Sequence, residues 1–221
     1  MYQRQYAANE WVKFAFAACF LFGIGNYLIS LLGAEYGSEG ILPLCFGQFF
    51  CFAFYHASVN NETFYMNKID GLKRIRGLLL RASNHLATIW LGCMAFTYAG
   101  RAHINQGVIA GLYASSILFT AIIFYFFYKE RISKPFILGA SLIIAGVLCV
   151  SLKLDDSVEI DYDMLIVACI FGIATGFSFA TNALIVKHYI RTAGFSPIQL
   201  NVDCIAVSGF FMLVMFIFTE T

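Results

Sequence analysis

The segment from Asn105 to Leu152 constrains the fold most, because it contains two long apolar runs joined by a short charged stretch. Each run has about 20 residues, and a helix of that length crosses the roughly 30 Å hydrocarbon core of a bilayer. The joining stretch, from Lys129 to Lys134, carries both basic and acidic side chains. The segment therefore predicts a transmembrane helical hairpin whose turn lies at a polar surface.

Composition extends this prediction to the whole chain. The 221 residues are 60% hydrophobic and only 12% charged, whereas soluble domains have about 25% charged residues. The seven cysteines lie in or beside apolar runs and form no CxxC pair. We therefore interpret them as small packed hydrophobic residues and expect no disulfide framework, no metal site and no cofactor.

Apolar runs mark about seven expected transmembrane helices, so the predicted fold class is an all-α integral membrane protein. The expected spans lie at 11–33, 41–57, 82–100, 105–128, 135–152, 164–186 and 198–218. The segment 58–81 then becomes the longest loop. We expect its basic end, GLKRIRGLLLR, to anchor at the membrane interface, with binding of anionic lipid as a weaker alternative.

Lysine and arginine predict how these spans are oriented. Of the 14 basic residues, all but Arg101 and Lys153 fall on one side of the expected bilayer, and the acidic loop 155–163 falls on the other. Basic loops face the cytoplasm, so the N-terminus is predicted to be cytoplasmic. The sequon at Asn61 lies on the same cytoplasmic side, and the organelle is left open.

Short matches between the first and sixth spans suggest an internal repeat. Phe22-Gly23-Ile24 recurs as Phe171-Gly172-Ile173, and Asn26-Tyr27-Leu28-Ile29 is echoed by Asn182-Ala183-Leu184-Ile185 at a different offset. Five crossings separate the two spans, which would enter the membrane from opposite sides. That arrangement is typical of an inverted repeat.

The hairpin carries a family resemblance. Its turn reads Lys129-Glu130-Arg131-Ile132-Ser133, and the run that follows contains Gly139-Ala140 and Ala145-Gly146-Val147. It resembles the fourth and fifth helices of EamA-type members of the drug/metabolite transporter superfamily, which have an "ER(I/L)S" turn and an "LGA…AGV" helix. The family usually has a proline in the fourth helix, where this chain has Ser115-Ser116-Ile117 and so no proline to kink it.

The resemblance implies a partial 5+5 inverted-repeat transporter fold. Residues 1–152 would form the first five-helix repeat, and residues 153–221 an acidic outer loop with the first two helices of a second, incomplete repeat. Family members have ten helices, so we expect the chain to be a fragment of a longer protein. The implied function is transport of small organic solutes by alternating access, through a cavity lined by the first, third and fourth helices and their counterparts.

Polar residues inside apolar runs are costly and mark candidate solute contacts. Two stripes have i, i+3, i+7 spacing, Gly23-Asn26-Ser30 in the first span and Thr175-Ser178-Asn182 in the sixth. The alternative is hydrogen bonding between helices without transport, and for aromatic residues it is core packing or interfacial anchoring. The candidate substrate-binding residues are Asn26, Trp90, Tyr98, Tyr113 and Asn182. Gln48 in the second span is a further lone polar candidate.

A carboxylate inside an apolar run, two sets of small residues and the charged turn lead to further predictions. Asp203 lies well inside an apolar run, either as a carboxylate stabilised by the helix N-terminus or as a proton- or cation-coupling site. The ridge Gly107-Gly111-Ser115 and the pair Gly172 and Gly176 predict close helix packing. Glu130 is expected to pair with basic residues of its own turn.

Competing functions remain open. A non-transporting membrane subunit or scaffold would keep the same fold, while a seven-helix receptor would have an extracellular N-terminus, opposite to the charge pattern. An enzyme is not expected, because the sequence shows no nucleophile–base set, metal cluster or glycine-rich phosphate loop. The expected partners are a small-molecule solute and the bilayer, not nucleic acid, and a homodimer is left open. The solute and the coupling ion are not identified.

Overall fold

The structure, a computed structural model, consists of helices joined by short turns over the residues it describes. These are 41–58, 71–151, 160–194 and 197–220, together with the helical residues Phe20, Leu21, Ile24 and Leu28. The helices are α2 (Ile41–Ser58), α3 (Gly71–Arg101), α4 (Gln106–Tyr113), α5 (Ser116–Tyr128), α6 (Lys134–Ser151), α7 (Tyr162–Ala193) and α8 (Pro197–Glu220). No strand occurs in these ranges, so the all-α expectation is confirmed there. Most of the expected span 11–33, including Asn26, and the sequon at Asn61 lie outside the described residues.

Within the described ranges, three helices are long and apolar enough to cross a membrane. They are Gln106–Tyr128, Tyr162–Ala193 and Leu200–Phe218, and Leu44–Ala57 and Lys134–Ile143 are shorter apolar helices. These helices indicate a membrane protein, while the total of seven spans stays a prediction. The apolar stretch of α3 is interrupted by Asn84 and His85.

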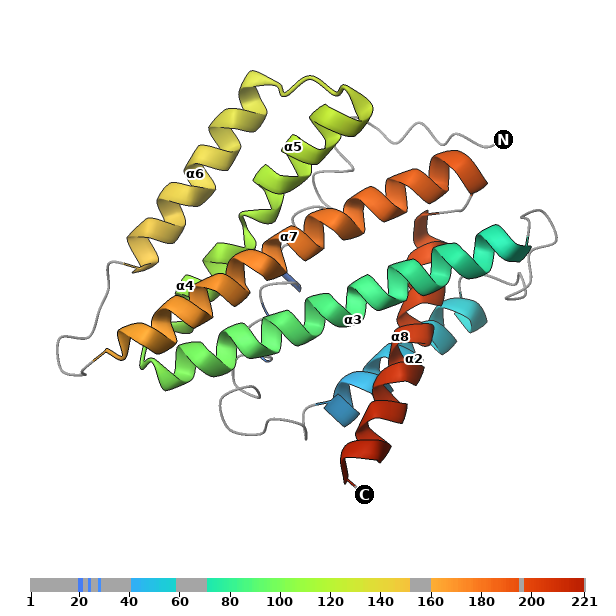
Figure 1. The fold of residues 1–221 in the computed structure, drawn as a ribbon. Coiled ribbons are helices and arrows are strands. Elements are labelled where there is room, and N and C mark those ends of the chain that lie inside the picture. The colour runs from blue at the N-terminus through green and yellow to red at the C-terminus, as the bar shows by residue number, and fades with distance from the viewer. Residues whose placement is uncertain are drawn as a thin grey trace.

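The long helices α3 and α7 pack along each other and form the centre of the molecule (Figure 1). Helix α5 packs on α7, and α6 returns from the α5 turn along the outside of the bundle (Figure 1). Helices α2 and α8 cross each other beside the first half of α3. A core of small and aromatic residues fills the space between the second half of α3, α4 and the start of α7.

Helix α3 begins earlier than the sequence predicted. The expected loop 58–81 is wrong from Gly71 onward, because the helix runs from Gly71 through the basic segment without interruption. Arg74 is buried in this extension while Lys73 and Arg76 are exposed. Interfacial anchoring therefore fits the two exposed residues and not Arg74, whose side chain turns toward other helices.

The predicted fourth span is one apolar segment built from two helices. Asn105 caps α4, accepting a hydrogen bond of 2.8 Å on Oδ1 from the backbone N–H of Gly107. The helix is interrupted at Ala114 and Ser115, although no proline is present. At this point α7 passes so closely that a Cβ on Gly176 would lie 3.3 Å from the carbonyl oxygen of Leu112. The close approach expected of the α7 glycines is confirmed.

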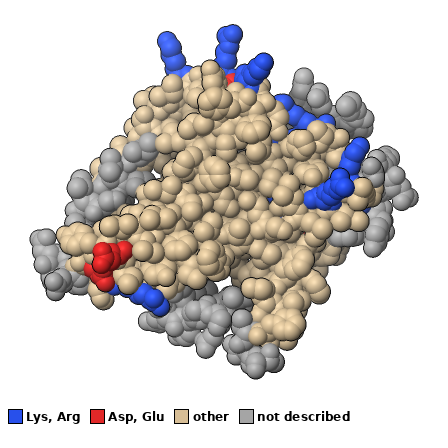
Figure 2. Space-filling view, in the orientation of Figure 1, with Lys and Arg blue, Asp and Glu red and all other residues tan. Residues whose placement is uncertain are grey.

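In Figure 2 the acidic side chains form one patch at the lower left, with a basic side chain beside it, and other basic side chains project from the top and the right of the molecule. Basic residues surround the turn between α5 and α6, and the acidic residues Asp161 and Asp163 lie at the start of α7, far from that turn. Glu130 pairs with Lys187 and Arg191 near the end of α7 rather than with basic residues of its own turn. This ion pair fixes the α5–α6 turn to α7.

Candidate functional site

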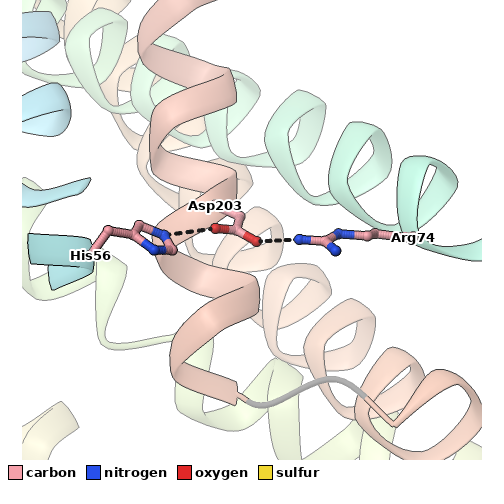
Figure 3. A network of polar contacts seen from close by, with 3 residues as sticks. All are labelled: His56, Arg74 and Asp203. Carbon is pink, nitrogen blue, oxygen red and sulfur yellow. Dashed lines mark hydrogen bonds and ion pairs between the residues drawn. The ribbon is translucent and has the colours of Figure 1, made fainter. Parts of the chain in front are cut away.

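Asp203 is the centre of a buried group of charges that joins three helices (Figure 3). Its Oδ1 lies 3.3 Å from Nε2 of His56 on α2, and its Oδ2 lies 3.4 Å from Nη2 of Arg74 on α3. The Asp203 side chain is completely buried and that of Arg74 is 9% exposed. We call His56, Arg74 and Asp203 the carboxylate cluster.

The helix geometry explains why these three residues meet. Asp203 follows Pro197 in α8, where the proline fits the first helical turn because its missing N–H would have no helical partner there. His56 lies in the last turn of α2, and Arg74 lies on the buried side of the first turn of α3. A carboxylate removed from water is costly unless it is paired. The guanidinium of Arg74 and the imidazole of His56, both on neighbouring helices, therefore stabilise Asp203 more directly than the helix N-terminus does.

A second polar group lies where α3 meets α7 and α8. Oγ1 of Thr88 accepts a hydrogen bond of 3.1 Å from Nδ2 of Asn182 and lies 2.6 Å from the hydroxyl of Ser178. Nδ2 of Asn84 donates to the carbonyl oxygen of Ser178 at 2.9 Å. These bonds join Ser178 and Asn182 of the α7 stripe to α3.

Arg81 extends this group toward α8. Its Nη1 donates to Oδ1 of Asn182, and its Nη2 donates to Oδ1 of Asn201 at 3.2 Å. Arg81 is half-buried, and its Nε is fully buried with no hydrogen-bond partner among the described residues. The amide cluster, as we name it, consists of Arg81, Asn84, Thr88, Ser178, Asn182 and Asn201.

The structure separates the residues that the sequence proposed for solute binding from one another and from Asp203, the candidate for coupling. Asn182 belongs to the amide cluster and Asp203 to the carboxylate cluster. The hydroxyl of Tyr113 donates to the carbonyl oxygen of Gly92 at 3.1 Å, inside the core. Trp90 and Tyr98 both contact the ring of Phe171, with ring centroids 5.9 and 5.6 Å away. Trp90 is 55% exposed, whereas Tyr98 is partly buried and packs against the core, so both lie apart from the two clusters.

Of the remaining polar candidates, Gln48 and Thr175 lie among the described residues. Asn26 lies outside the described residues. Gln48 on α2 is buried, and its Oε1 accepts a long hydrogen bond of 3.4 Å from the Ser208 hydroxyl on α8. Thr175, the first residue of the α7 stripe, is buried but donates to the Phe171 carbonyl of its own helix at 2.7 Å. Gln48 and Thr175 therefore take part in packing and helix contacts rather than in either cluster.

The residues of α2 and α3 that complete both clusters were not among those predicted from the sequence. Arg74, Arg81 and Thr88 are spaced by seven residues, and Ala95 continues the same interval into the core. That spacing keeps them on one side of a helix, and it is the signal that could have placed the two arginines among buried positions. His56 shows no comparable signal, since it lies at the end of an apolar run.

Among the described residues, no group of three His, Cys, Asp or Glu side chains could hold a metal ion. Comparison with protein-family models, with curated proteins and with solved structures found no match. Inference about function therefore rests on the two clusters and on the apolar helices around them.

Proposed function

We propose that the protein is a multi-pass membrane transporter that moves small organic solutes by alternating access. The observation that supports this most is the amide cluster, which places amides, hydroxyls and a guanidinium between helices that are otherwise apolar. Such groups are expensive in a membrane and typically face a solute or ion pathway. Amide and hydroxyl groups can exchange their mutual hydrogen bonds for bonds to a polar solute at little cost.

The proposal includes the predicted topology and family. The basic end of the bundle would face the cytoplasm, as basic loops do, and the N-terminus would lie on that side. The EamA-like turn at Glu130 and the span echo around Asn182 favour two inverted five-helix repeats. In that arrangement α7 would be the counterpart of the first helix, and its polar stripe would line the central pathway.

Within this proposal the carboxylate cluster is the coupling site. The Asp203 carboxylate can exchange a proton, and Arg74 would hold the carboxylate charge when the proton leaves. A proton or cation bound there would change the contacts between α2, α3 and α8, the three helices that the cluster joins. Coupling therefore predicts that uptake depends on pH and that Asp203→Asn removes the dependence.

A non-transporting subunit or scaffold is the second candidate. One observation favours it, because Asn84, Thr88, Ser178 and Asn182 already bond to each other across the α3–α7 interface. Bonds of this kind can hold membrane helices together, each contributing about 1 kcal/mol. A scaffold would need the cluster for stability only.

Uptake into proteoliposomes separates the two candidates. A thermal-stability screen of the purified full-length protein against a metabolite library would supply solutes for uptake. We expect Thr88→Val to reduce uptake several-fold, because it removes a hydroxyl that contacts both Asn182 and Ser178.

Thr181→Val is the matched control, because the Thr181 hydroxyl donates to the Phe177 carbonyl of its own helix at 3.1 Å. It should transport as the unmodified protein does. If no solute enters above the level of empty liposomes although the protein is folded, the protein is a subunit or scaffold and the transporter proposal is wrong.

A further inference from the structure

The charge of Arg81 differs from the other buried charges in how it is compensated. Arg74 is paired with Asp203, and that carboxylate also contacts His56. Arg81, one heptad further along α3, forms no ion pair within the described ranges. Its two hydrogen bonds go to Asn182 and Asn201, which are neutral.

A half-buried guanidinium without a carboxylate is energetically unfavourable. Amide oxygens satisfy some of its N–H groups but do not neutralise it, and the buried Nε–H makes no bond among the described residues. Removing a charge from water without a counter-charge is unfavourable, and a buried donor without a partner adds to that cost. A bound anion would supply the counter-charge that the described residues do not provide.

The geometry also prepares Arg81 to bind an anion. Amides from α7 and α8 hold the two ends of the guanidinium, so its plane is fixed before a ligand arrives. A planar guanidinium presents five N–H donors in a fork that matches carboxylate and phosphate oxygens. Two of these donors bond to the asparagines, and the remaining N–H groups include the buried Nε–H.

We propose that the transported solute is an anion, whose carboxylate or phosphate oxygens bind the guanidinium of Arg81. This inference rests on the proposed transport function and names its substrate class. The two asparagines orient the guanidinium, and the solute supplies the negative charge that its surroundings lack. Binding would then compensate a charge that lies between α3, α7 and α8, and so would favour the conformation in which these helices close around the solute.

Binding to the purified full-length protein in detergent tests the inference. The probes are succinate against its neutral analogue succinamide, and glycerol 3-phosphate against glycerol, all at one ionic strength. We expect at least one anion to raise the melting temperature in a saturable manner, while its neutral analogue has no effect. The two anions separate a carboxylate ligand from a phosphate ligand. If neither anion acts differently from its neutral analogue, the inference is wrong, and this comparison needs no variant.

Variants assign the effect to one residue. Arg81→Gln should weaken anion binding about tenfold or more, because charge-assisted hydrogen bonds are about twice as strong as neutral ones. Arg81→Lys keeps the charge without the fork and should bind with intermediate affinity. Arg76→Gln is the control, since Arg76 is an exposed arginine of the same helix, and it should bind as the unmodified protein does. Equal anion binding by Arg81→Gln and by the control would overturn the assignment.

Uptake measurements separate this inference from the transport proposal. Anion binding that depends on Arg81, without uptake of any solute, would keep the anion site and overturn transport. Uptake of neutral solutes that is unchanged in Arg81→Gln, with no competition from either anion, would keep transport and overturn the anionic substrate.

Discussion

Arg74 and Asp203 are 129 residues apart in the chain, yet Nη2 of the arginine lies 3.4 Å from Oδ2 of the aspartate inside the helix bundle. The pair joins the first turn of α3 to α8. Because the Asp203 side chain is completely buried, its carboxylate has no solvent to replace a lost partner. The pair is therefore the contact whose disruption should most affect how α8 packs.

Removing one charge of this pair should destabilise the protein strongly. We expect Arg74→Gln or Asp203→Asn to lower the free energy of unfolding by up to about 3–5 kcal/mol, the cost of breaking a buried pair, and by less in Arg74→Gln because His56 still contacts Asp203. Denaturant titration in mixed micelles would measure it. The control is Asp163→Asn, at an exposed position in the first turn of α7, which should cost under about 1 kcal/mol.

The double variant Arg74→Met with Asp203→Leu provides a sharper check. It removes both charges, so its loss of stability should be much smaller than the sum of the losses of Arg74→Met and Asp203→Leu measured singly. Additive losses would mean that the two side chains do not stabilise each other.

Gly176 lies where α7 crosses the interruption between α4 and α5. A Cβ there would collide with Oγ of Ser115 and lie 3.3 Å from the backbone N of Ser116. We expect Gly176→Ala to cost about 1–3 kcal/mol by overpacking, measured by the same titration. Gly139→Ala, which would meet nothing within 4 Å, should cause no loss.

The hydroxyl of Ser115 gives this prediction a second test. It is buried and has no hydrogen-bond partner among the described residues, so Ser115→Ala alone should be neutral or stabilising. Combined with Gly176→Ala it should recover part of the loss, because the nearest obstacle is gone while the backbone contacts remain. No recovery would show that the backbone contacts alone cause the strain.

Much of the helical framework follows from the sequence because long apolar runs leave few alternatives in a membrane. The hairpin around Glu130 was expected, and a turn between two helices is present at Lys129 to Ser133. The start of α3 was missed for a physical reason. The sequence predicts a loop for this basic segment. In the structure it is helical, and Arg74 on one side of the helix faces Asp203 of α8 instead of the surface.

The site was only partly predictable for a related reason. Sequence spacing could place Ser178 and Asn182 on one side of α7, but it could not choose the helix opposite them. That choice depends on packing, which brings Thr88 to the stripe and gives Arg81 two asparagine partners from different helices. Asp203 stands out in the sequence as an acidic residue inside an apolar run. Its partner His56 does not, because the two residues meet only where α2 and α8 cross.

The ion pairs at Glu130 should contribute little to stability although they connect distant segments. The Glu130 side chain is 44% exposed, and such pairs contribute about 0.2–1 kcal/mol. We therefore expect Glu130→Gln to lower stability by no more than this, and by less at high salt. Titrations at two salt concentrations would show it, and a loss above about 2 kcal/mol would contradict the surface-pair interpretation.

Tyr113 provides the last prediction, because the structure uses its hydroxyl inside the core. The hydroxyl donates to the Gly92 carbonyl at 3.1 Å, and the ring packs edge-on against Phe96. Tyr113→Phe should cost about 1 kcal/mol, the usual net value of one buried hydrogen bond, and should leave the affinity for a transported solute unchanged. Denaturant titration and uptake at several solute concentrations would measure the two effects. A change in solute affinity without a loss of stability would return Tyr113 to the solute-binding residues.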